Sequence, residues 1–246
     1  MKWKLFFLLM SLGLIGIYLM CYIALPQLLM GKTIPLPLEQ IQLVSFSQST
    51  VFLAVACTVG IGLHEKVQLD SPIIRGVLTH HLDAVSFKPI LIWSISGGVF
   101  GSIILIGYHY LFLQLTQFLA LTETSSSLPI VVRIFYGGIT EEILLRWGVM
   151  TFLVWCLVKL FVKNFTSIPN LYYWIAILLS SFIFATLHLP ILFSTITTPS
   201  SILIFMVIIG NSLFGLIAGY LYWKHGLESA MIAHILAHFI AFLVVG

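Results

Sequence analysis

Three charged side chains interrupt an otherwise apolar run of the sequence, GGITEEILLRWGVM, at Glu141, Glu142 and Arg146. An ionisable group near the centre of a membrane helix costs about 2.5–3.5 kcal/mol on insertion scales, so such groups usually carry a function or pair with one another. Glu142 and Arg146 are four residues apart and share a helical face, which predicts an ion pair. Glu141 is rotated by about 100° from Glu142 and is expected to point elsewhere, into a cavity.

This difference predicts separate roles for the two glutamates. We expect Glu142 and Arg146 to form a structural ion pair that places their helix. Glu141 would then be the carboxylate that remains available for proton transfer. The alternative is that the three charges only satisfy one another in the core of a helix bundle.

Three histidines in later apolar segments are candidate partners for that carboxylate. His188 ends the segment SSFIFATLHLP, just before Pro190, where the helix should break. His234 and His238 in SAMIAHILAHFIAF are four residues apart and therefore lie on one helical face. Imidazoles so arranged can bind a metal, hydrogen-bond a substrate or pair with a carboxylate. A glutamate and histidines from three helices can converge only inside a bundle, where their common purpose would be to activate water.

The elements that must position these side chains are membrane helices. Hydrophobic residues make up 60% of the 246-residue chain and charged residues only 8%, and a membrane span needs about 20 mostly apolar residues. We therefore expect residues 1–246 to form a single integral membrane domain. Its predicted fold class is all-α, a polytopic bundle of seven to eight transmembrane helices. Seven spans are predicted at about 5–25, 45–63, 90–113, 129–158, 171–188, 201–223 and 228–245. The segment HEKVQLDSPIIRGVLTHHLDAVSFKP, between the second and third spans, predicts interfacial helices.

Basic residues in the loops predict the orientation in the membrane. With the N-terminus in the cytoplasm, eight basic residues lie in inside segments and two, Lys32 and Arg133, lie outside. The inside residues are Lys2, Lys4, Lys66, Arg75, Lys88, Lys159, Lys163 and Lys224. We therefore expect a plasma membrane protein with a cytoplasmic N-terminus, in contact with the lipid bilayer and not with nucleic acid. In this orientation His188 falls near the outer end of its span, whereas His234 lies about 9 Å from the inner end of its own, so the side on which a site opens is not assigned.

Three motifs in this order, on successive hydrophobic segments, resemble those of the CAAX-protease and bacteriocin-processing family of intramembrane proteases, also called CPBP or Abi. They are E-E-x-x-x-R from Glu141, F-x-x-x-H from Phe184 and H-x-x-x-H from His234. The resemblance covers residues 129–245, which it identifies as the catalytic core. The third motif usually ends in Asn or Asp. His238 departs from that pattern, although a ring N–H can still donate to a developing oxyanion.

The resemblance implies an endopeptidase, known in eukaryotic members to remove the last three residues of prenylated CAAX proteins. Bacterial members are linked to peptide maturation, bacteriocin self-immunity and regulated proteolysis, so the expected partner is a membrane-associated protein or peptide substrate. Peptide hydrolysis needs an activated water, stabilisation of the oxyanion and an acid for the leaving amine. We expect Glu141 to be the general base and later the proton donor, and His188 to position the water. His234 and His238 would be the oxyanion donors.

A metal-dependent version of this chemistry would use the same residues. The family is labelled metalloprotease, although a glutamate/histidine mechanism without metal has been proposed for it. In the metal version, His188 and His234, with His238 or Glu141, would hold zinc. The HExxH spacing of the common zinc peptidases is absent from the sequence. We expect no obligatory cofactor, and Zn²⁺ is the alternative.

Two other functions remain open from the sequence. Intramembrane Glu and His residues also mark ion pathways, which makes a proton- or metal-ion transporter an alternative. A transporter would predict Gly- or Pro-broken helices in two related halves, whereas every strong polar site here lies in the second half. A catalytically silent member of the family, acting in immunity or as a scaffold, would keep the same motifs.

One glycine-rich span carries a further polar residue. Asn211 lies in IIGNSLFGLIAGYLYW, together with Gly210, Gly215 and Gly219. Small residues at this spacing favour close helix packing, and a substrate contact is the alternative role for Asn211.

Overall fold

A computed structural model describes residues 2–118, 128–162, 167–196 and 198–246 of the chain. The described residues form helices and connecting turns, with no strand. Seven of these helices are long and apolar enough to cross a membrane. They are Lys2–Leu29, Leu38–Leu63, Phe87–Leu115, Ile130–Phe161, Asn170–Ser194, Ser201–His225 and Leu227–Val245. The predicted all-α polytopic bundle is confirmed, and each predicted span overlaps one of these helices.

Several spans are built from more than one helical element. The first contains α1 (Lys2–Leu19), a π-turn segment (Met20–Ala24) and α2 (Leu25–Leu29), and the second is α3 (Leu38–Leu63). The third is α5 (Phe87–Phe118). The fourth contains α6 (Ile130–Val132), two π-helical stretches (Arg133–Glu141 and Ile143–Met150) and α7 (Thr151–Phe161). The last three are α8 (Asn170–Thr186) with α9 (Leu189–Thr195), α10 (Ser201–His225) and α11 (Leu227–Val245).

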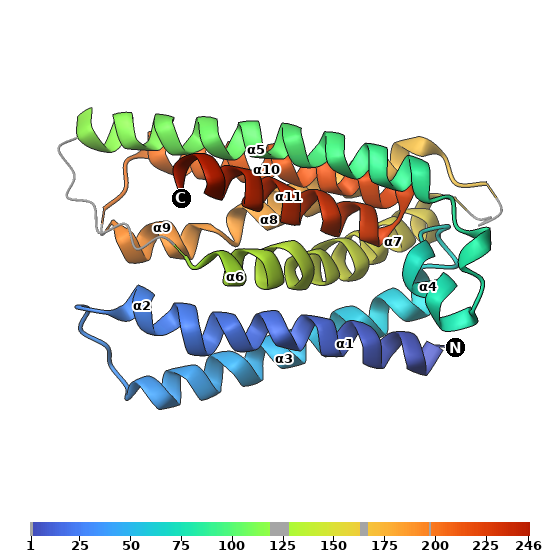
Figure 1. Ribbon diagram of the computed structural model, residues 1–246, viewed down its shortest axis with the longest axis horizontal. Coiled ribbons are helices and arrows are strands. Elements are labelled where there is room, and N and C mark those ends of the chain that lie inside the picture. The colour runs from blue at the N-terminus through green and yellow to red at the C-terminus, as the bar shows by residue number, and fades with distance from the viewer. Residues whose placement is uncertain (1, 119–127, 163–166, 197) are drawn as a thin grey trace.

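Successive spans run in opposite directions through one bundle, and the two ends of the chain lie at opposite ends of it (Figure 1). α1 and α3 form one side, and α5 forms the other with α10 and α11 beside it. The span of α6 and α7 runs between these two groups. The helix that carries both glutamates is therefore surrounded by protein rather than placed at the rim. Lys163, one of the eight basic residues used to predict the orientation, lies outside the described residues.

The predicted interfacial region contains one short helix, α4 (Pro72–Thr79), and a 3₁₀ turn (Leu82–Ala84). The backbone N–H of Ile74 in α4 donates to Glu228 Oε1 over 2.7 Å, and Leu227 N–H donates to the Asp70 carbonyl over 3.0 Å. Glu228 is only 7% exposed, so α11 begins beneath α4 inside the protein.

The fourth span differs from the regular α-helix expected over residues 129–158, because most of its first two thirds is π-helical. Threonine hydroxyls accompany the wider turns. Thr140 Oγ1 donates to the Phe135 carbonyl over 3.2 Å and to the Gly13 carbonyl of α1 over 2.9 Å, and Thr151 Oγ1 donates to the Arg146 carbonyl over 3.2 Å. Both intrahelical contacts join residues five apart, which is the spacing of a π-turn. Such turns are frequent at functional sites.

Glycines allow α8 and α10 to pack closely, as the small-residue pattern predicted. A Cβ added to Gly215 would lie 2.8 Å from Ser181 Cβ, and one added to Gly219 would lie 3.0 Å from Ile177 Cγ2. Ser180 and Ser181 donate to the Ile177 carbonyl over 3.2 and 2.6 Å, so their hydroxyls are satisfied within α8. Close backbone approach therefore fixes the distance between these two helices.

This packing predicts that Gly215→Ala destabilises the protein by about 1–3 kcal/mol, because the added methyl group has no room beside Ser181. Gly107→Ala is the matched control, since Gly107 lies within α5 and a Cβ there meets no atom within 4 Å. The fraction of monodisperse protein that survives heating in detergent measures the effect. Equal survival of the two variants would show that the helices do not depend on this contact.

Candidate active site

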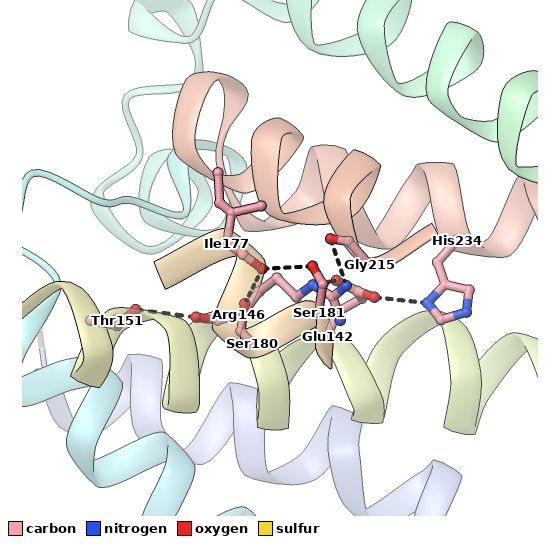
Figure 2. Close-up of polar contacts among 8 residues, drawn as sticks. All are labelled: Glu142, Arg146, Thr151, Ile177, Ser180, Ser181, Gly215 and His234. Carbon is pink, nitrogen blue, oxygen red and sulfur yellow. Dashed lines mark hydrogen bonds and ion pairs between the residues drawn. The ribbon is translucent and has the colours of Figure 1, made fainter. Parts of the chain in front are cut away.

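Glu142 is the centre of the polar network in the bundle. Its side chain is fully buried, with Oε1 2.8 Å from His234 Nδ1 and Oε2 3.3 Å from Arg146 Nε (Figure 2). An ionised carboxylate only accepts hydrogen bonds, so Nδ1 of His234 carries the proton and donates it. The other ring nitrogen of His234, Nε2, therefore faces away from Glu142.

Arg146 extends the network from the fourth span to α8 and α10. Its side chain is also fully buried, and Nη2 donates to the Gly215 carbonyl over 3.1 Å. The guanidinium carbon lies 4.9 Å from the ring centre of Phe184. Figure 2 shows Arg146 between the helix that carries Glu142 and the helix that carries Gly215. The ion pair expected from the four-residue spacing is present, and the surrounding contacts lower the cost of burying both charges.

Aromatic rings and a glycine set the position of the two histidines of α11. The ring centre of His234 is 4.3 Å from that of Phe214 and 4.9 Å from that of His238, which stacks on it at 21°. A Cβ added to Gly137 would lie 2.9 Å from His238 Nε2 and 3.6 Å from His234 Nε2. Both imidazoles thus pack directly against the fourth span at Gly137, where any larger side chain would collide with His238.

His188 lies where the fifth span changes direction. α8 ends at Thr186 and α9 begins at Leu189 with Pro190 in its first turn, so the predicted helix break is confirmed. His188 Nδ1 is 2.8 Å from the Phe184 carbonyl. A carbonyl can only accept, so Nδ1 carries the proton and Nε2 of the neutral ring is a free acceptor. The Phe184 ring contacts both histidines. Its centre lies 4.6 Å from the ring centre of His188 and 6.1 Å from the ring centre of His234.

Glu141 differs from its neighbour in having no fixed partner. It is half-buried, and within the described part of the chain its carboxylate makes no hydrogen bond or ion pair. It interacts electrostatically with Glu142, Arg146 and the Tyr136 hydroxyl. The structure therefore brings His234, its stacked neighbour His238 and Glu142 together. His188 lies near this group, with the Phe184 ring in contact with both His188 and His234. No hydrogen bond joins Glu141 to His188 among the residues described.

A zinc site of the kind expected from the sequence needs three ligand side chains that lie close together. Over residues 2–118, 128–162, 167–196 and 198–246, no three His, Cys, Asp or Glu side chains are grouped closely enough to hold one metal ion. His234 and His188 each use Nδ1 for a protein partner, which leaves one nitrogen of each ring free. The ligand set of His188, His234 and His238 is therefore not assembled among the described residues.

Two residues of the site were not identified from the sequence. Gly137 lets the imidazoles of His234 and His238 approach the fourth span closely, and Glu228 fixes the start of α11 against α4. Gly137 could have been found from the two adjoining glycines in GGITEE, because a glycine inside a helix often marks a close approach of another part of the chain. The role of Glu228 could not be predicted from the neighbouring sequence, since its partner Ile74 is 154 residues away in the chain.

Comparison with known proteins identifies one family. Residues 123–240 match the family described as type II CAAX prenyl endopeptidase Rce1-like. The resemblance predicted from the three motifs is confirmed, and the matched stretch contains all seven motif residues, Glu141, Glu142, Arg146, Phe184, His188, His234 and His238. No curated protein and no solved structure matches the chain.

The two adjacent glutamates are predicted to differ in their effect on stability. Glu142→Gln removes the charge that balances buried Arg146, and an uncompensated buried charge of this kind costs about 3–5 kcal/mol. Glu141→Gln, the matched control, breaks no hydrogen bond or ion pair among the described residues and should change stability little. Unfolding in mixed micelles titrated with sodium dodecyl sulfate, followed by tryptophan fluorescence, measures both. The separation of roles is wrong if Glu141→Gln costs as much as Glu142→Gln.

Proposed function

Because residues 123–240 belong to the type II CAAX prenyl endopeptidase family, we propose that the protein is an intramembrane endopeptidase. Its proposed substrate is a membrane-associated or prenylated protein or peptide. One observation carries the proposal for this chain. Glu142 pairs with His234 Nδ1 and with Arg146 inside an apolar bundle, while Glu141 and the Nε2 atoms of His188, His234 and His238 make no hydrogen bond within the described residues.

In the proposed mechanism, Glu141 and His188 hold the attacking water. Both are acceptors, Glu141 through its carboxylate and His188 through Nε2, so each takes one hydrogen of the water and leaves an oxygen lone pair free. Glu141 removes a proton as the water oxygen bonds to the scissile carbonyl carbon. Glu141 then gives this proton to the leaving nitrogen as the C–N bond breaks, and the products are an amine and a carboxylic acid, which loses its remaining proton to water.

The oxyanion of the tetrahedral intermediate is proposed to accept hydrogen bonds from His238 and His234. Nε2 of both rings lies near Gly137 of the fourth span, and each ring can donate when Nε2 carries a proton. Donors placed where negative charge develops contribute about 10²–10³-fold each to the rate. The ring of His238 would take the role of the amide or acid that usually occupies this position in the family.

Glu142 and Arg146 have a structural role in this proposal. Their contacts to His234, Gly215 and Phe184 join the fourth span to α8, α10 and α11. A catalytic side chain must be held within about 0.5 Å of its productive geometry, and packing and hydrogen bonds of this kind supply that restraint.

The proposal also includes the location and orientation of the chain. The distribution of basic residues, eight against two, supports a plasma membrane protein with the N-terminus in the cytoplasm. With seven spans, the C-terminus would then lie on the other side.

Cleavage of a peptide library by the purified protein in lipid vesicles tests this function. The library contains prenylated CAAX peptides and the same peptides without the prenyl group. We expect the wild type to cleave at least one peptide, and Glu141→Gln to be slower by about 10²–10⁴-fold because it lacks the general base. A chelator should leave the wild-type rate unchanged.

Other outcomes of this assay have separate meanings. Loss of activity in chelator with recovery on adding zinc would contradict the metal-free mechanism but keep the protease. A folded wild type that cleaves no peptide would contradict the protease and favour a silent member that acts in immunity or as a scaffold.

A further inference from the structure

Asn211 is a polar residue of the bundle interior that the proposed mechanism does not use. Asn211, Phe214 and Gly215 share a face of α10, because they are three and four residues apart. Phe214 contacts the His234 ring at 4.3 Å between centres, and the Gly215 carbonyl accepts from Arg146. This face of α10 is thus the one that meets the active site.

The antiparallel packing of α10 and α11 places Asn211 near the depth of His238. The two helices are joined by a tight turn at Gly226, where φ is +91°. Measured from the contact between Phe214 and His234, Asn211 is three residues farther from the turn along α10, or about 4.5 Å. His238 is four residues farther along α11, or about 6 Å. The carboxamide and the imidazole therefore lie at similar depth.

The surroundings of Asn211 mark the edge of the polar site. One helical turn beyond it, Val207 is buried in an apolar cluster with Leu192, Ile196 and Leu203. One turn in the other direction, Gly215 contacts the charged network. Asn211 is half-buried at the border between the two.

The Asn211 side chain has unused hydrogen-bonding capacity. Nδ2 donates to the Val207 carbonyl over 2.8 Å, which uses one of its two hydrogens. The second hydrogen and Oδ1 have no partner among the residues that the structure describes. The bond to Val207 also fixes the rotamer of the side chain, so the remaining N–H has a set direction.

We propose that Asn211 is a further catalytic residue, which donates its second Nδ2 hydrogen to the carbonyl oxygen of the bound peptide beside His238. This inference rests on the proposed endopeptidase function and adds a donor from α10 to the site. A neutral amide donates without a change of protonation, whereas His234 and His238 can donate only when Nε2 carries a proton. Asn211 would therefore supply oxyanion stabilisation that does not depend on the protonation of either ring.

Steady-state cleavage by Asn211→Leu tests the proposal. Leucine is close in size, suits a membrane helix and cannot donate, so the variant should fold. We expect kcat to fall by about 10²-fold with KM changed little, as for the loss of one oxyanion donor. Asn170→Ala is the matched control, because Asn170 is an exposed asparagine at the start of α8 and should keep wild-type kcat.

Two results would overturn this inference and leave the proposed function in place. Wild-type kcat in Asn211→Leu, with Glu141→Gln inactive, would overturn the role of Asn211 and leave the endopeptidase in place. A raised KM with unchanged kcat would also overturn it, since the residue would then only help to bind substrate. If Asn211→Leu does not fold, Asn211→Ala decides by the same criterion. A folded wild type without any activity would refute the proposed function and this inference together.

Discussion

The arrangement of the site depends on one buried ion pair, between Glu142 and Arg146. Neither charge can reach water, so each must be satisfied by protein groups. Glu142 pairs with Arg146 and accepts a hydrogen bond from His234, and Arg146 donates through Nη2 to the Gly215 carbonyl and lies against the Phe184 ring. Nη1 of Arg146 has no hydrogen-bond partner among the described residues. Four membrane spans are therefore held in one relative position by the need to compensate two charges. Apolar packing alone would not specify that position, because lipid solvates apolar side chains equally well.

The same pair explains how two adjacent glutamates can differ in chemistry. Glu142 is committed to its partners, while Glu141 has turned to another direction and keeps its carboxylate free. His234 is affected in a similar way, since Nδ1 bonds to Glu142 while Nε2 lies on the side of the ring near Gly137 of the fourth span. The structural charges thus orient the groups proposed to react, as supporting contacts do in other active sites.

Local patterns predicted much of this structure, and long-range contacts account for the rest. The length of apolar runs identified seven spans, the four-residue spacing identified the pair of Glu142 and Arg146, and Pro190 marked the break after His188. The π-turns of the fourth span depend on a hydroxyl that contacts a different helix at Gly13. The cap of α4 on Glu228 joins residues 154 apart, so no sequence window contains both partners. The roles assigned to Glu141, His188, His234 and His238 remain predictions.

The central claim is that Glu142 orients His234 through its Nδ1 hydrogen. Nuclear magnetic resonance of the protein labelled with nitrogen-15 at histidine, in lipid nanodiscs, measures which ring nitrogen carries a proton. The signals of His234 are identified by their absence from a His234→Gln variant. We predict an N–H group at Nδ1 of His234 that takes part in a hydrogen bond. A bare Nδ1, with the proton on Nε2 alone, would contradict the claim.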